Sequence, residues 1–130
     1  MCPPGTDSKE TIMAIAVQHV HHKTRDPKAT AQYYIDNFGA KMKAAMAGTG
    51  VQIDLHGLQM NITEIMTTQN HEQHLGLEHL AVTTDDYPGT LERLRGNGVK
   101  VLEELIGSSG NRVAFVAAPD GAQMEIIEQV

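Results

Sequence analysis

The chain has 130 residues, 41% hydrophobic and 20% charged, which is typical of one compact domain with its own core. A formal net charge of −6 argues against binding to nucleic acid, and the single cysteine, Cys2, excludes an internal disulfide or a cysteine zinc site. No apolar run is long enough to cross a bilayer and no signal peptide opens the chain, so we expect a cytoplasmic protein with no membrane partner.

The first half of the chain predicts a strand, a helix and three more strands. Residues 1–11 are polar and aperiodic and are expected to form a flexible arm, and residues 12–23 have the β-branched composition of a strand. Asp26 and Pro27 favour the start of a helix, whose apolar positions up to Phe38 we expect to pack on the sheet, and Gly39 ends it. Short strands are expected at about 40–46, 51–56 and 58–65.

The second half predicts the same order again. After a polar linker at 66–76, a strand begins at Leu77, and Asp86 precedes a second helix that ends near Gly96. Strands are expected at about 99–105, 112–117 and 122–128. The sequence therefore predicts an α+β fold of two βαβββ modules, residues 12–65 and 77–130, within one domain.

The two halves also match residue by residue. His19 and His79 each stand seven positions before the aspartate that precedes a helix, and the eight residues 57–64 share five identities with the eight residues 121–128. Such a repeat indicates paired supersecondary units that complete one another's core. In this alignment His79 takes the position of His19, and Glu125 takes the position of Asn61.

This alignment predicts a metal site. If the halves pack around a pseudo-twofold axis, His19, His79 and Glu125 converge, and two imidazoles with one carboxylate suit a divalent first-row metal. Asn61 would offer a neutral oxygen at a fourth position. Glu64, the other carboxylate on that strand, matches Glu128 and should face the opposite side.

His21 shares a strand face with His19, because side chains alternate along a strand. We expect it to contact substrate or bound water as a catalytic acid or base and not to bind the metal. A polar residue of the pocket wall without a chemical role is the alternative, since the second half carries Ala81 at the equivalent position.

These features resemble the vicinal oxygen chelate superfamily, which includes glyoxalase I, methylmalonyl-CoA epimerase, extradiol dioxygenases and antibiotic-resistance proteins. The similarity covers roughly residues 12–128. It rests on Gln18-His19-Val20, on residues 26–27 and 33–40, on residues 78–82, and on the Pro-Asp-Gly…Glu ending at residues 118–128. The resemblance implies a cupped mixed sheet. Half-length modules leave exposed sheet edges, which favours a homodimer, and because the family also pairs modules between chains, the site is expected inside one chain or shared by two.

The resemblance also implies His19, His79 and Glu125 as ligands of a divalent ion (Fe, Ni, Co, Zn or Mn). Asn61 stands where glyoxalase I has Glu and the epimerase has Gln. The expected function is that of a metal-dependent lyase or epimerase acting on a small oxygen-chelating substrate through an enolate-like intermediate. An amide at position 61 cannot transfer a proton, which argues against plain lactoylglutathione lyase activity.

Two other functions stay open. An extradiol-type Fe(II) dioxygenase needs two histidines and one carboxylate and leaves other positions open, which accommodates Asn61. A protein that only binds a small molecule, such as an antibiotic, is the third possibility. Members of that kind usually lack the metal ligands, so the complete set in this chain argues against it.

Overall fold

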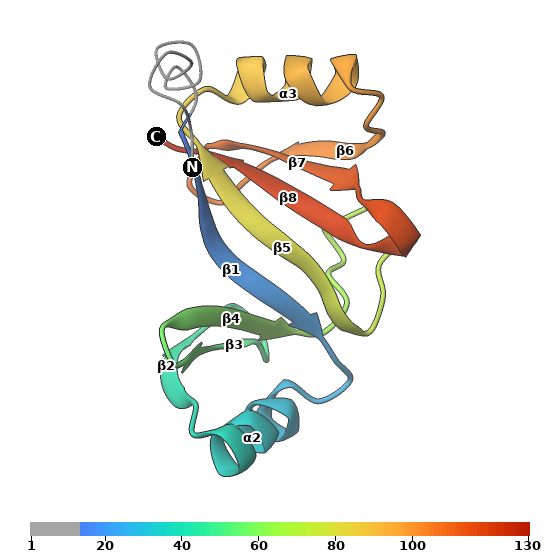
Figure 1. Ribbon diagram of the computed structural model, residues 1–130. Helices are drawn as coiled ribbons and strands as arrows, with labels where there is room; N and C mark the ends of the chain where they lie inside the picture. Colours follow the sequence, from blue (N-terminus) through green and yellow to red (C-terminus); the bar gives the residue numbers. More distant parts are fainter. Residues whose placement is uncertain (1–13) are drawn as a thin grey trace. The chain divides into compact units, whose positions relative to one another are not determined.

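The computed structural model describes residues 14–130, so the expected arm at 1–11 and the start of the first expected strand lie outside the described residues. The described chain forms two βαβββ series and one short 3₁₀ turn (Figure 1). The first series is β1 (Ile15–Lys23), α2 (Pro27–Phe38), β2 (Lys41–Ala45), β3 (Val51–Leu55) and β4 (Leu58–Thr63). The second is β5 (Gly76–Thr84), α3 (Tyr87–Gly96), β6 (Val101–Ile106), β7 (Arg112–Ala117), η2 (Pro119–Gly121) and β8 (Gln123–Glu128). The α+β fold class predicted from the sequence is confirmed.

The chain divides into two compact units. One is Gln18–Ala81, and the other contains Val82–Val130 together with the described residues 14–17. The long strands β1 and β5 each contribute residues to both units, so the units do not coincide with the two halves of the sequence.

In the Gln18–Ala81 unit the strand order is β2-β3-β4-β1, in which β1 runs parallel to β4 and the other neighbours are antiparallel. Helix α2 packs against β2, β3 and β4. The Asp26 carboxylate accepts a hydrogen bond from the backbone N–H of Ala29 at 3.1 Å, and Gly39 ends the helix in the left-handed conformation, with φ at 73°. The core contains Ala31, Ile53, Met60 and Ile62.

One expectation about this helix is wrong. Phe38 was expected to pack on the sheet, but it is 54% exposed, and its ring lies 5.9 Å from the ring of Tyr33. Phe38 is the last residue of α2, where the chain already turns away at Gly39, so helical spacing no longer places it over the sheet. Tyr34, one turn earlier, does pack against the core.

In the other unit, β8, β7 and β6 form an antiparallel series, and α3 packs against β8. Asp86 caps α3 by accepting a hydrogen bond from the backbone N–H of Gly89 at 3.0 Å. The core of this unit contains Val82, Tyr87, Leu91, Ala114, Val116 and Ile126. No helix among the described residues is long and apolar enough to cross a membrane.

Candidate metal centre

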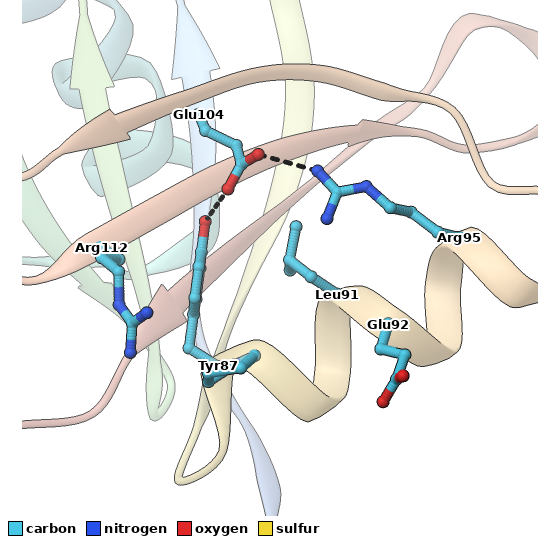
Figure 2. A pocket seen from close by; sticks show the side chains of 7 residues that line it. Tyr87, Leu91, Glu92, Arg95, Glu104 and Arg112 are labelled. Carbon is cyan, nitrogen blue, oxygen red and sulfur yellow. Dashed lines mark hydrogen bonds and ion pairs between the residues drawn. The ribbon is translucent and has the colours of Figure 1, made fainter.

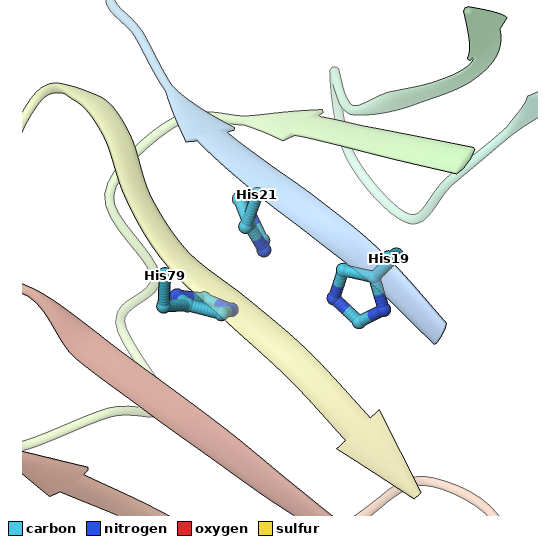
Figure 3. Close-up of side chains that lie close together, drawn as sticks. All are labelled: His19, His21 and His79. Carbon is cyan, nitrogen blue, oxygen red and sulfur yellow. The ribbon is translucent and has the colours of Figure 1, made fainter. Parts of the chain in front are cut away.

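Three histidines gather in the Gln18–Ala81 unit. His19 and His21 project from the same face of β1, and His79 projects from β5, so that the three rings surround a common space (Figure 3). Alternation along β1 explains the first pair, because residues two apart point to the same side of a strand. The third ring comes from a position about 60 residues further along the chain, as the internal repeat predicts.

The three rings are buried and close. Each histidine is at most 5% exposed, and one ligand nitrogen from each ring lies within 4.8 Å of the others. The ring centroids are 6.1 Å apart for His19 and His21, 6.0 Å for His19 and His79, and 4.8 Å for His21 and His79. Nitrogens bound to one tetrahedral zinc ion stand about 3.4 Å apart, given bonds of about 2.1 Å. Small side-chain rotations would therefore let these nitrogens share one ion.

Oxygen acceptors fix the protonation of two rings. Nδ1 of His19 donates to Oε1 of Gln18 at 2.7 Å, and Nδ1 of His79 donates to Oε1 of Glu78 at 2.8 Å. In a neutral imidazole with the proton on Nδ1, the lone pair is on Nε2. The two repeat-equivalent histidines thus have the same tautomer, each held by the residue immediately before it.

His21 has the opposite arrangement. Its Nε2 lies 2.7 Å from Oγ1 of Thr63, and that hydroxyl donates its own proton to the backbone carbonyl of Glu64 at 2.8 Å. Thr63 therefore accepts the proton of Nε2, and the lone pair of His21 is on Nδ1. Histidines that bind metals are held in this way, with one ring nitrogen donating to an oxygen and the other binding the ion. The donor set fits a divalent metal.

Behind His79 lies a buried ion pair. Nζ of Lys23 is 3.0 Å from Oε1 of Glu78, and neither side chain is exposed. Burial alone would raise the pKa of the Glu78 carboxyl, but hydrogen bonds from His79, from the backbone N–H of His74 and from Lys23 outweigh it and lower this pKa to about 2. Glu78 is therefore an anion that accepts the His79 proton at any neutral pH.

Asn61 and Glu64 lie in different surroundings. Asn61 is opposite His21 in the parallel register of β1 and β4, is 7% exposed, and accepts a hydrogen bond from Nε2 of Gln59 at 3.1 Å. Glu64 is exposed beyond the end of β4, where its carboxylate accepts a hydrogen bond from Oγ1 of Thr49 at 2.6 Å. Of the two, Asn61 shares the strand face that carries Thr63, the partner of His21.

Glu125 belongs to the other unit. It lies on β8, opposite Phe115 of β7, and is partly buried. The structure describes the two units separately, so its predicted place beside the two imidazoles stays a prediction.

Sequence reasoning missed two features of the centre. Alternation along the strand places His21 on the face of His19. It gives no reason for the rings of His21 and His79 to be the closest of the three pairs, because the repeat carries Ala81 at the position equivalent to His21. Sequence reasoning also gave Lys23 and Glu78 no role. A lysine at a strand end is ordinarily solvated, and only the alternation His19, His21, Lys23 hinted that this one faces inward.

A separate pocket of about 390 Å³ lies in the other unit, between α3 and strands β6 and β7 (Figure 2). The hydroxyl of Tyr87 donates to Glu104 at 3.0 Å, and Arg95 forms an ion pair with the same carboxylate at 2.8 Å. Arg112 lies 4.9 Å above the Tyr87 ring and pairs with Glu128 at 2.6 Å. Both guanidinium groups already have carboxylate partners, which is the arrangement of a structural ion-pair network.

Comparison with known proteins gives the class of this chain. Residues 16–126 match the family model described as the Glyoxalase/Bleomycin resistance protein/Dioxygenase superfamily, and the chain belongs to this superfamily. The lactoylglutathione lyase of Arabidopsis thaliana is 25% identical over 122 residues, which cover 85% of this chain and 43% of that protein. The chain thus spans less than half the length of this curated relative.

Two solved structures share the fold. A hypothetical protein from Bacillus halodurans C-125 has a TM-score of 0.71 and 15% identity, over 90% of this chain and 96% of its own. Methylmalonyl-CoA epimerase from Mycobacterium tuberculosis has a TM-score of 0.65 and 18% identity, over 88% of this chain and 87% of its own. At these identities the likeness establishes the glyoxalase-like fold and leaves the substrate open.

Proposed function

We propose that this protein is a metal-dependent enzyme that removes a proton next to a carbonyl group of a small substrate carrying two neighbouring oxygen atoms. The observation that carries the proposal is the set of three buried imidazoles, each with one nitrogen fixed by an oxygen acceptor and one bearing a lone pair. Membership of a superfamily that includes lyases, and likeness in fold to an epimerase, support the same reaction type.

His19 and His79 would hold the metal through Nε2, and the sequence predicts Glu125 as the carboxylate ligand. A bound divalent ion would supply a Lewis acid that polarises a carbonyl oxygen and makes the neighbouring C–H more acidic. Gln18 and Glu78 keep the two ligand rings in the required tautomer.

His21 would take the proton. Its lone pair is on Nδ1, and Thr63 holds the opposite nitrogen in place, so the ring has a fixed orientation when it accepts a proton from carbon. When His21 returns the proton to the neighbouring carbon, the product is an isomer. An epimer would form only when a second acid on the opposite face of the substrate gives a proton to the same carbon. The amide of Asn61 is not an acid or a base near neutral pH, and the ammonium of Lys23 is paired with Glu78, which leaves the imidazole of His21 as the base proposed here.

Exchange of the substrate proton with solvent tests this function. Wild-type protein loaded with Zn²⁺, Ni²⁺ or Co²⁺ is incubated in D₂O with methylmalonyl-CoA or with the hemithioacetal of methylglyoxal and glutathione, and deuterium at the carbon next to the carbonyl is followed by NMR. We expect exchange with at least one substrate that His21→Ala abolishes while the metal content is retained. The matched control is Glu64→Gln, which replaces an exposed carboxylate of the same unit. This variant should catalyse exchange of the substrate proton at the wild-type rate.

The same variants test the competing role of His21. A His21→Ala protein that loses its metal together with its activity would make His21 a third imidazole ligand and not the base. Absence of exchange with either substrate in metal-loaded wild type would reject the proposed reaction for these two substrate classes.

The second candidate is an extradiol-type dioxygenase, which the neutral side chain of Asn61 favours. Two histidines and one carboxylate suit Fe(II), and a non-ligating residue at position 61 would leave space for a catechol. Consumption of oxygen with ring opening of catechol by the Fe(II)-loaded protein, absent in His79→Ala, would establish this function in place of proton transfer.

A further inference from the structure

Lys23 is a buried cation whose three donors all have acceptors. Its side chain has no exposed surface, and Nζ lies 3.0 Å from Oε1 of Glu78, 2.9 Å from Oε1 of Gln69 and 2.6 Å from Oε1 of Gln73. A lysine is rarely retained in such a place without a partner of opposite charge, because removing the ammonium from water costs several kcal/mol. The arrangement is therefore specified by several residues together.

Glu78 is the centre of this network. Oε1 accepts from Nδ1 of His79 and from Nζ of Lys23, and Oε2 accepts from the backbone N–H of His74 at 2.8 Å. The carboxylate thus joins one proposed metal ligand to a buried cation and to the segment that precedes β5.

The internal repeat supplies a natural comparison. Gln18 holds His19 as Glu78 holds His79, with nearly equal distances of 2.7 Å and 2.8 Å. A neutral amide oxygen is therefore sufficient to orient a ligand ring in this fold. The second half uses a carboxylate, and a carboxylate buried at this point requires the cation that Lys23 provides.

The network also holds the connection between the two halves. Oε1 of Gln73 accepts from Lys23 and from the backbone N–H of Met66, and Nε2 of Gln73 donates to the backbone carbonyl of Met66. Gln69 reaches Lys23 from the same segment. The irregular segment between β4 and β5 is thus hydrogen-bonded to Lys23, the partner of the Glu78 carboxylate that accepts from His79.

We propose that Lys23 and Glu78 are positioning residues of the metal centre, which keep the proton of His79 on Nδ1 and present Nε2 as its ligand atom while tying residues 66–74 to the site. The proposal rests on the proposed metal-binding function. It differs from that function in assigning the orientation of His79 to a buried pair that touches neither metal nor substrate.

Two double variants separate orientation from charge. Lys23→Met with Glu78→Gln removes both charges and keeps an oxygen acceptor for His79, as Gln18 does for His19. Lys23→Met with Glu78→Met removes both charges and the acceptor, at similar volume. Neither variant leaves a charge of the pair unpaired, so both avoid the main cause of misfolding.

The first readout needs no metal. Long-range ¹H–¹⁵N spectra of the histidine rings at pH 8 distinguish the two tautomers. We expect the Nδ1–H form for His79 in wild type and in the Gln double variant, and a mixture of forms in the Met double variant. His21 should show the Nε2–H form in all three proteins, because Thr63 is unchanged.

The second readout is the affinity for Co²⁺, followed by its absorption bands, with thermal unfolding of the metal-free proteins as a control for structure. Loss of the group that orients a ligand histidine typically weakens metal binding by about 10- to 100-fold. We expect this loss in the Met double variant and recovery to within a few-fold of wild type in the Gln double variant.

The outcomes are distinct. Equal Co²⁺ affinity in the two double variants, or the Nε2–H form of His79 in wild type, would overturn the positioning role and leave the metal site in place. Wild-type protein that binds no divalent metal would overturn the proposed function and the positioning role with it.

Discussion

Removing Lys23 alone should be far more damaging than removing the whole ion pair. In Lys23→Met, Glu78 remains a buried carboxylate, since neither side chain of the pair is exposed and no solvent replaces the lost ammonium. Loss of one partner of a buried pair costs about 3–5 kcal/mol. That is a large part of the roughly 5–15 kcal/mol of unfolding free energy expected for a domain.

The magnitude follows from the contacts. Lys23→Met removes the cation nearest to the carboxylate and one donor to each of Gln69 and Gln73, while the bonds to Glu78 from His79 and His74 remain. Because the pKa of Glu78 is about 2, the carboxyl group of the native protein is ionised at pH 7 and does not become neutral through ordinary titration. Lys23 is one of the causes of this low pKa, so Lys23→Met should raise the pKa of Glu78, and the free energy lost at pH 7 is the smaller of the cost of an unpaired buried carboxylate and the cost of protonating it.

Urea unfolding at pH 7 measures this difference for wild type, Lys23→Met, and Lys23→Met with Glu78→Met. The double variant should be more stable than the single variant, because a pair of apolar side chains replaces an unpaired charge. A single variant that loses less than about 1 kcal/mol, or a double variant no more stable than the single, would refute the claim that the pair is buried and coupled.

Three further predictions follow from particular contacts. Burial, with the hydrogen bond to Glu104, raises the pKa of Tyr87 to about 12, so the native state keeps a proton that the unfolded chain loses near pH 10. The unfolding free energy should therefore be lower at pH 11 than at pH 9 in urea unfolding, and the decrease should be smaller in Tyr87→Phe. Asn61→Glu should tighten metal binding and raise turnover of the glutathione hemithioacetal, whereas Glu64→Gln should change neither. Loss of metal in Glu64→Gln would show that the alignment of residues 57–64 with residues 121–128 is wrong. Asp26→Ala should lower the unfolding free energy by about 1 kcal/mol through loss of the bond to the N–H of Ala29, and an unchanged urea midpoint would refute the cap.

The parts of the centre that the sequence predicts are those fixed by periodicity and repetition. Alternation along one strand places His19 and His21 on one face, and the repeat pairs His19 with His79. The helices were predictable from Asp26, Asp86 and Gly39, because caps act through local backbone geometry.

The remainder depends on contacts between distant segments. Gln69 and Gln73 lie in an irregular stretch without periodicity, so nothing local connects them with Lys23, although they hold its ammonium group. Phe38 fits helical spacing yet lies exposed, because the chain ends its helix at that residue. Glu125 lies in the other unit, and its role rests on the repeat and on the resemblance.

Metal content measured on purified, metal-loaded protein tests the central claim most directly. After removal of unbound ions, elemental analysis of wild type should find about one divalent ion per chain. His19→Ala and His79→Ala should lose it while keeping the circular dichroism spectrum of a folded protein, and Glu64→Gln should keep it. Wild-type protein without bound metal, or His79→Ala with the full wild-type content, would contradict the account.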